Sequence, residues 1–227
     1  HVFLSKDKGQ KWEKIFNVPL FFNTYITQKN KSSFVLTQDS VIYSNNNFEN
    51  HSTYIIHDEI RKIYLDINFR ITSELNLFTS SYDIDGQTNE KFLHHHNLIT
   101  NEYNKYSLAN FDSLIVNEQL ETSFSGNTLL MYAYKRLSQN EYLPFLIISD
   151  DNFKTHIVKK LPILGNIKTD HLNNYFLFRN DDLWISLDKG DTWIDLGQKL
   201  PSGTIIIDVQ TSQDNFLYLA TNKGILK

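Results

Sequence analysis

The most conspicuous absence in this sequence is cysteine, of which there is none. Disulfides, thiol catalysis and cysteine-ligated zinc or iron are therefore excluded for these residues, although a cysteine-free chain suits compartments both inside and outside the cell. A stretch rich in proline, glycine and serine, or an abrupt change in composition, would mark a domain boundary, and neither occurs. We therefore expect residues 1–227 to form a single domain.

An excess of positive charge and long apolar runs are also missing. The 26 acidic residues outnumber the 22 basic ones, and lysine and arginine are scattered along the chain. A nucleic-acid-binding protein would carry a basic patch or stripe. Apolar runs such as 143–148 are too short to span a bilayer, and residues 1–7 lack the charged-then-apolar order of a signal peptide. We therefore expect no nucleic-acid partner and no membrane-spanning segment in this stretch; if the chain is exported, its signal has been removed.

The residues that are abundant favour strands. Phe, Tyr, Ile, Val and Thr gather in short runs that Asn, Asp, Lys and Gly interrupt. This pattern is typical of an all-β protein, whereas helix signals are weak. The clearest strand candidates are residues 34–37, 128–134, 175–178, 205–209 and 216–220.

An internal repeat is the most informative feature. Two segments share the pattern S-x-D-x-G-x-x-W, and each lies between two apolar runs. Its residues are Ser5, Asp7, Gly9 and Trp12 in one segment, and Ser186, Asp188, Gly190 and Trp193 in the other. Short Ser and Asp side chains can hydrogen-bond to turn backbone groups, Gly permits positive φ, and Trp buries a large flat surface. We therefore expect a hairpin turn at each segment.

Two weaker copies keep the spacing but carry Phe at the glycine position and His at the tryptophan position. They consist of Ser44, Asn46, Phe48 and His51, and of Ser149, Asp151, Phe153 and His156. The same paired exchange in both copies argues against chance, and we expect the turn to differ where Phe replaces Gly. A fifth candidate, formed by Ser81, Asp83, Asp85 and Gly86, departs from the spacing.

The spacing of the copies matches one four-stranded propeller blade per repeat. Ser5 and Ser44 are 39 residues apart and Ser149 and Ser186 are 37 apart, while the gap of 105 between Ser44 and Ser149 leaves room for an eroded unit and an insertion. In this register the chain begins and stops in the third strand of a blade. We therefore expect incomplete blades at both ends, in a piece of a longer protein or of a larger propeller.

The repeated pattern resembles the Asp-box, or BNR repeat, of bacterial and viral-type sialidases, of sortilin and Vps10-type receptors, and of related propellers. The resemblance implies an all-β β-propeller of four-stranded antiparallel blades, with about five to six blades represented in whole or part. It also implies a structural role for the motif residues of all four copies. In the family the motif forms the turn between the two outer strands, away from the face where propellers usually bind.

Two polar clusters are candidates for metal binding. His94 and His96 would share one face of a strand, where two neutral imidazoles could hold a metal if a third ligand approached; the alternative is an exposed polar strand or loop. The segment 81–86 is similar to the start of an EF-hand calcium loop, but the closing position is Phe92, which favours a simple polar turn. We therefore predict neither a metal nor a cofactor. If a metal were bound, His94 and His96 would be the candidate ligands.

The resemblance to sialidases implies an arginine triad for the substrate carboxylate, a Tyr nucleophile assisted by Glu, and an acid/base Asp. The candidate arginines are Arg70, Arg136 and Arg179, and residues 69–72 are distantly similar to the F-R-I-P motif of the family. The proline is absent, however, and the segment follows two copies of the repeat although the family places it before the first. The alternative for Arg70 is a strand residue with a solvated head group.

The segment 129–134, followed by 144–151, is similar to a longer hairpin that precedes some boxes in Vps10-type receptors, whose propellers bind peptides and proteins. Because the sequence contains no complete catalytic set, we predict a non-enzymatic recognition module that binds a glycan or a protein ligand through loops on one propeller face. The alternatives are a sialidase-like glycoside hydrolase and an assembly or scaffolding factor of the Asp-box type. We expect an extracellular, cell-surface or lumenal location.

Overall fold

The computed structural model describes residues 2–5, 7, 10–16, 25–29, 32–37, 39–46, 48–62, 70–72, 74–82, 90–109, 114–123, 128–212 and 216–227. These residues form antiparallel sheets, a five-residue helix α1 (Asp58–Lys62) and a 3₁₀ turn (Gly197–Lys199). The strands lie where the sequence predicts them, since all five of the clearest candidate ranges coincide with observed strands to within one or two residues at each end. No helix in these ranges is long and apolar enough to cross a membrane.

The sheets are the blades of a β-propeller, in sequence order. Blade 1 contains β3 (Tyr25–Lys29), β4 (Ser32–Leu36), β5 (Ser40–Ser44) and β6 (Ser52–Ile55), and blade 2 contains β7 (Arg70–Ile71), β8 (Asn76–Tyr82), β9 (Lys91–Asn97) and β10 (Glu102–Ser107). Blade 3 contains β11 (Ile115–Thr122), β12 (Leu129–Arg136), β13 (Tyr142–Ser149) and β14 (Ile157–Lys160), and blade 4 contains β15 (Asn166–Thr169), β16 (Tyr175–Arg179), β17 (Asp182–Ser186) and β18 (Ile194–Asp195). Blade 5 contains β19 (Ile206–Thr211), β20 (Leu217–Thr221) and β21 (Gly224–Leu226). The remaining strands, β1 (Val2–Leu4) and β2 (Glu13–Phe16), pair with each other.

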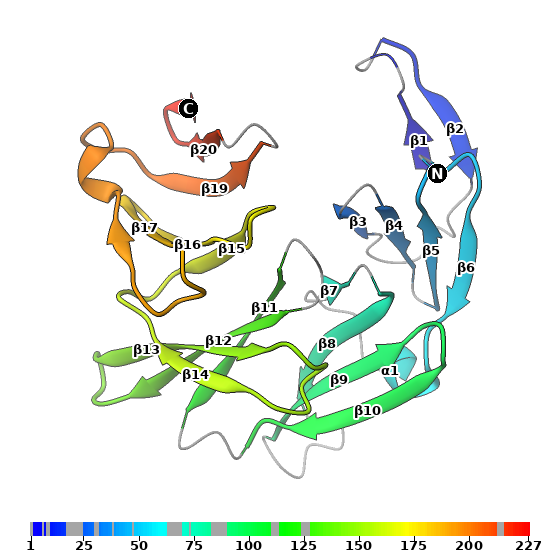
Figure 1. Cartoon of the computed structure of the whole chain (residues 1–227), viewed down its shortest axis with the longest axis horizontal. Coiled ribbons are helices and arrows are strands. Elements are labelled where there is room, and N and C mark those ends of the chain that lie inside the picture. Colours follow the sequence, from blue (N-terminus) through cyan, green and yellow to red (C-terminus); the bar gives the residue numbers. More distant parts are fainter. Residues whose placement is uncertain are drawn as a thin grey trace.

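Figure 1 shows the blades following one another around an arc, from β3–β6 through β7–β10 and β11–β14 to β15–β18 and β19. The first strands of neighbouring blades lie side by side, with β11 between β7 and β15. The prediction of an all-β propeller of four-stranded antiparallel blades is confirmed, and the five blades fall within the expected five to six.

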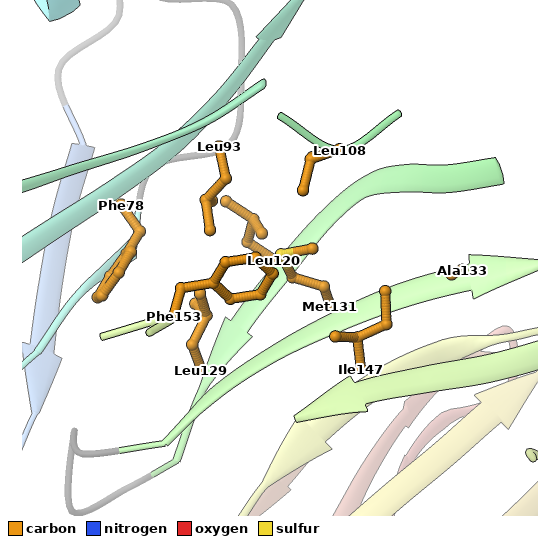
Figure 2. Close-up of a cluster of buried hydrophobic side chains, with 9 residues drawn as sticks. All are labelled: Phe78, Leu93, Leu108, Leu120, Leu129, Met131, Ala133, Ile147 and Phe153. Atoms are coloured by element: carbon orange, nitrogen blue, oxygen red, sulfur yellow. The ribbon is translucent and has the colours of Figure 1, made fainter. Parts of the chain in front are cut away.

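Each inner blade buries both of its faces against neighbours. Along β12, Leu129, Met131 and Ala133 face blade 2, whereas Leu130 and Tyr132 face blade 4. Successive side chains of a strand point to opposite faces, so a strand buried on both sides needs apolar residues at every position. This explains the unbroken apolar run at 129–134, and Figure 2 shows the cluster that blades 2 and 3 form together.

The turns alternate between the two faces of the propeller, because neighbouring strands are antiparallel. The turns after the first and third strands of each blade lie on one face, which we call the motif face because the S-x-D segments lie there. The turn after the second strand and the link to the next blade lie on the other, which we call the connection face.

A polar residue at the end of the first strand closes the first turn in four blades, a feature that the sequence analysis missed. Each side chain accepts a backbone N–H from four or five residues onward. The pairs are Thr72 with Asn76 (3.1 Å), Ser123 with Thr128 (3.1 Å), Asp170 with Asn174 (2.8 Å) and Ser212 with Phe216 (3.2 Å). These turns give the motif face a second repeated hydrogen bond.

Blade 2 occupies the long gap between Ser44 and Ser149, as expected for an eroded unit. Its third strand ends at Asn97, the position where blades 1, 3 and 4 have serine. The Asn97 Oδ1 atom accepts the backbone N–H groups of Ile99 (3.0 Å) and Thr100 (2.9 Å). The hairpin therefore closes with a different side chain, which is why the repeat is hard to recognise there.

Candidate functional site

The four S-x-D or S-x-N segments form turns with one hydrogen-bond pattern. In blade 4 the Ser186 hydroxyl donates to Asp188 Oδ1 (2.8 Å) and accepts the Gly190 N–H (2.7 Å), while Asp188 accepts the Thr192 N–H (2.8 Å). The distances in blade 3 are 3.0, 2.9 and 2.8 Å for the corresponding bonds of Ser149 and Asp151. The motif carboxylates are therefore occupied by turn backbone and hydroxyl groups.

The other two turns repeat these bonds. Ser44 donates to Asn46 Oδ1 (2.9 Å) and accepts the Phe48 N–H (2.8 Å). Ser5 donates to Asp7 (2.9 Å), which accepts the Lys11 N–H (2.8 Å). Gly9 lies outside the described residues. An asparagine can replace the aspartate because the bonds need only an acceptor oxygen.

The expectation that phenylalanine changes the turn is wrong. Gly190 has φ 87°, and Phe153 and Phe48 adopt the same left-handed region, with φ 70° and 62°. The Phe153 ring is buried against blade 2, and it stacks on His156 with ring centroids 5.6 Å apart. In blade 4, Trp193 packs against blade 3. Phe153, at the glycine position of its motif, thus fills the same kind of space between blades that Trp193 fills from the tryptophan position, which lies three residues further along the motif.

The first motif departs from the expected burial of tryptophan. The Trp12 side chain is 64% exposed, whereas Trp193 is half-buried. The shared hydrogen bonds therefore do not require the indole to be buried.

The turn carboxyl groups have depressed pKa values because they accept several hydrogen bonds. Bonds from the Thr192 hydroxyl and backbone, and then from Ser186, lower the pKa of Asp188 to about 2. The pKa of Asp151 is lowered chiefly by the Thr155 hydroxyl and backbone. The backbone N–H of Lys11 similarly lowers the pKa of Asp7. These groups stay ionised near neutral pH, where they serve the turn.

His94, His95 and His96 lie in β9 and are buried, which corrects the alternative of an exposed polar strand. Ser81 and Tyr103 lie within hydrogen-bond distance of the two ring nitrogens of His94, at 2.7 and 2.8 Å. His96 accepts the His57 N–H through Nδ1 (3.3 Å), and its Nε2 lies 2.9 Å from Asn101 Oδ1. Both metal candidates thus have their ring nitrogens in hydrogen bonds.

The candidate metal ligands named in the sequence analysis do not come together with further ligands in the described part of the chain. No three His, Asp or Glu side chains gather there as metal ligands would. Ser81, at the start of the EF-hand-like segment, contacts His94, while 83–86 lie outside the described residues.

Burial favours the neutral forms of His95 and His96 in β9. It lowers the pKa of His95 to about 4 and also lowers the pKa of His96. Because Asn101 Oδ1 only accepts, His96 Nε2 carries the proton and Nδ1 is left to accept the His57 N–H. Protonating Nδ1 would set two donors against each other. The folded state of blade 2 therefore favours the neutral forms of His95 and His96.

The three candidate arginines lie in different surroundings. Arg70 Nε is 3.6 Å from Glu121 Oε2, in an ion pair between the first strands of blades 2 and 3. Arg136 donates to the carbonyl groups of Ser138 and Gln139, in the β12–β13 turn. Arg179 lines a pocket to which neither of the others contributes. Within the described residues, the arginines do not converge as a carboxylate-binding triad would.

The pocket at Arg179 lies on the connection face between blades 3 and 4, and its volume is about 340 Å³. The β12–β13 hairpin, the link from blade 3 to blade 4 and the end of β16 form its walls. They contribute Tyr132, Tyr134, Tyr142, Leu164, Gly165, Asn166 and Arg179.

Aromatic side chains dominate this pocket. The Tyr134 and Tyr142 rings meet edge to face with centroids 5.3 Å apart. Tyr132 is 3% exposed, and its hydroxyl has no hydrogen-bond partner in the described part of the chain. Burial raises the pKa of Tyr132 to about 12, against the opposing effect of the Arg179 charge. The pocket thus combines a cation, phenol hydroxyls and apolar ring surface.

Sequence reasoning reached this pocket only in part. The sequence indicates Arg179 only as a candidate for an arginine triad, and it relates the β12–β13 hairpin to a hairpin of receptor propellers. Leu164, Gly165 and Asn166 carry no motif. Gly165 does carry a structural signal, because a Cβ there would lie 2.6 Å from the Phe178 carbonyl oxygen. The link can pass this close to β16 only with glycine.

Comparisons with known proteins show the fold. YCF48, in a structure with a bound D1 peptide, has a TM-score of 0.59 and 15% sequence identity, and the match covers 98% of this chain and 70% of that one. YCF48 from Cyanidioschyzon merolae has a TM-score of 0.60 and 10% identity, covering 98% and 74%. No protein-family model matches the chain, and no curated protein matches it significantly. The structural neighbours are β-propellers, in agreement with the fold described above.

Proposed function

We propose that this chain is a non-enzymatic recognition propeller that binds a protein partner through its connection face. The pocket between blades 3 and 4 carries this proposal. Tyrosine and arginine are the residues in which binding energy at protein interfaces concentrates, and they make up most of the pocket wall. Beside it, the β12–β13 turn presents the half-exposed Leu137, which adds apolar surface.

The surroundings of the arginines favour recognition over glycoside hydrolysis. A sialidase-like mechanism needs several arginines on one substrate carboxylate, but Arg70 is paired with Glu121 and Arg136 with its own turn. Only Arg179 of the three lines the aromatic pocket. A single arginine beside tyrosines is better suited to binding a side chain of a partner protein than to sialidase-like hydrolysis of a glycoside.

The peptide complex of YCF48 supports a peptide or protein as the partner, since it is an example of a β-propeller that holds a peptide. The sequence alone does not decide whether the ligand is a glycan, an assembly partner or another protein. We propose a protein ligand because of the tyrosine and arginine wall.

We also propose that the four S-x-D or S-x-N turns are Asp-box hairpins. Their shared hydrogen bonds support this assignment. Their place on the motif face leaves the connection face for binding.

Panning a library of random linear peptides against the purified protein tests the recognition function. We expect enriched peptides whose dissociation constants, measured by calorimetry, rise about 10- to 100-fold when Tyr142 is replaced by alanine. Lys154→Ala is the control, because Lys154 is exposed in a turn on the motif face.

Two outcomes would contradict the proposal. One is that no peptide is enriched above a blank surface, and the other is that peptides bind equally to the wild type and the Tyr142 variant. A glycan array run in parallel would redirect the assignment if it alone gave binding.

A further inference from the structure

The aromatic pocket offers hydrogen-bond donors and a positive charge but no acidic group. Asp and Glu outnumber Lys and Arg in the whole chain, 26 to 22, yet none of the described lining residues is acidic. The polar lining consists of three phenols, Asn166 and the Arg179 guanidinium. This composition suits a ligand group that accepts hydrogen bonds and carries negative charge.

Arg179 has its charge available for a partner. It ends β16 and is exposed, and in the described part of the chain its guanidinium makes neither a hydrogen bond nor an ion pair. A guanidinium has five N–H donors in a planar fork that matches a carboxylate. The neighbouring Asp182, which pairs with Arg179 in the β-ladder, does not form an ion pair with it.

Tyr132 adds a second unused donor. Its ring lines the pocket and its buried hydroxyl has no acceptor within the described residues. A buried hydroxyl without an acceptor is energetically costly, and an acceptor brought by a ligand would remove that cost. Side chains at interfaces commonly change rotamer on binding, so a shift of the half-buried Tyr134 or Tyr142 ring would give the ligand access to this hydroxyl.

We infer that, on the basis of the recognition function proposed above, this pocket takes the carboxylate of an acidic side chain of the partner. Arg179 binds the carboxylate, the Tyr132 hydroxyl donates to it, and the Tyr134 and Tyr142 rings contact the methylene groups of the same side chain. A single guanidinium balances one carboxylate, whereas a doubly charged phosphate would need further cations that the described wall lacks.

The test uses an array of acetylated, amidated peptides in pairs that differ only by glutamate or glutamine at one central position, flanked by leucine and tyrosine. Capping leaves the side chain as the single carboxylate in each acidic peptide. The wild-type protein should bind the glutamate members roughly 10- to 100-fold more tightly than their glutamine partners, as expected for a charge-assisted bond. Arg179→Gln should abolish this preference, and Arg179→Lys should keep part of it.

Controls separate the pocket from general charge effects. Lys154→Gln removes the same charge from the motif face and should leave the preference unchanged. Tyr132→Phe should weaken the binding of the glutamate peptides more than that of the glutamine peptides, because the hydroxyl bonds a carboxylate more strongly than an amide oxygen. Thermal unfolding of each variant checks that the fold is retained.

Two results overturn the inference. If the wild type binds glutamate and glutamine peptides equally, or if Arg179→Gln weakens both equally, the pocket does not recognise a carboxylate, while peptide recognition itself stands. If no peptide binds, the proposed function fails together with the inference.

Discussion

The turns of blades 3 and 4 that follow the third strand have the same hydrogen bonds and different aromatic side chains. Each also receives a bond from the preceding blade, since Tyr106 donates to the Asn152 carbonyl (3.2 Å) and Lys159 to the Lys189 carbonyl (3.0 Å). In blade 3, Phe153 fills the space toward blade 2, and in blade 4, Trp193 packs toward blade 3. The polar frame of the turn and its apolar contact are therefore separable.

The paired exchange in the sequence has a steric cause. A Cβ on Gly190 would lie 3.8 Å from Trp193 Cζ2 and 3.7 Å from Leu146 Cδ2. A large side chain there would compete with the indole for one space. Phenylalanine at this position therefore requires a smaller ring at the tryptophan position, as His156 provides.

The largest difference between the two turns should come from truncating their aromatic residues. Phe153 is 6% exposed, so Phe153→Ala should lower the free energy of unfolding by about 3–5 kcal/mol. Trp193 is only half-buried, so Trp193→Ala should cost about 1–2 kcal/mol. Urea unfolding measures both, and an equal loss would contradict the unequal burial.

Blade 2 lacks the S-x-D turn and instead contains the buried His95. This histidine should make the stability of the protein depend on pH between 6.5 and 4. Folding lowers the pKa of His95 from 6.5 to about 4. Below pH 6.5 the unfolded chain therefore binds a proton that the folded chain rejects. Stability should fall as the pH decreases from 6.5 to 4, by up to about 3 kcal/mol.

His95→Gln should flatten this limb of the pH profile, measured by chemical unfolding at several pH values. His51→Gln is the matched control, because His51 is exposed. A wild-type profile that stays level between pH 6.5 and 4 would be inconsistent with a neutral, buried His95.

Exchanging the two aromatic arrangements should reveal their coupling. Gly190→Phe alone should destabilise the protein by about 1–3 kcal/mol through overpacking against Trp193. The double variant Gly190→Phe, Trp193→His reproduces the arrangement of blade 3, and its loss should be smaller than the sum of the single losses by about 1 kcal/mol. Additive losses in the double-mutant cycle would show that the two side chains do not share one space.

The smallest effect should come from Asp188→Asn, because Asn46 serves the same turn in blade 1. Folding lowers the pKa of Asp188 from 3.8 to about 2. The stabilisation by the carboxylate is thus complete above pH 3.8 and is lost as the pH falls toward 2. Melting temperatures of the variant and the wild type should converge over this range, and a constant offset would disprove the link.

Much of the fold was predictable from the residues. Local turn chemistry, the apolar run at 129–134 and the period of the repeats are all properties of short segments. Blade 2 was harder to recognise, because Asn97 replaces serine and the buried histidines of β9 read as polar. The incomplete blades at both ends and the extracellular or lumenal location stay predictions.

The candidate site was less accessible from the sequence. Tyr132, Leu164 and Arg179 lie in β12, in the link to blade 4 and in β16, with no common motif, and the sequence suggests Arg179 only as a candidate for a carboxylate-binding arginine triad. Only packing shows that it stands apart from Arg70 and Arg136. The pocket depends on side chains from two blades, which no local pattern records.

The sequence by itself determined the four S-x-D or S-x-N turns and the clearest strands, because serine, aspartate and glycine at fixed spacing satisfy backbone groups within a few residues of one another. The tertiary structure decided which aromatic residue fills the described spaces between blades, which of the described histidines are buried, and which of the three candidate arginines lines the aromatic pocket. These properties depend on contacts between residues that lie far apart in the chain. Burial and charge therefore become defined only when neighbouring blades pack together.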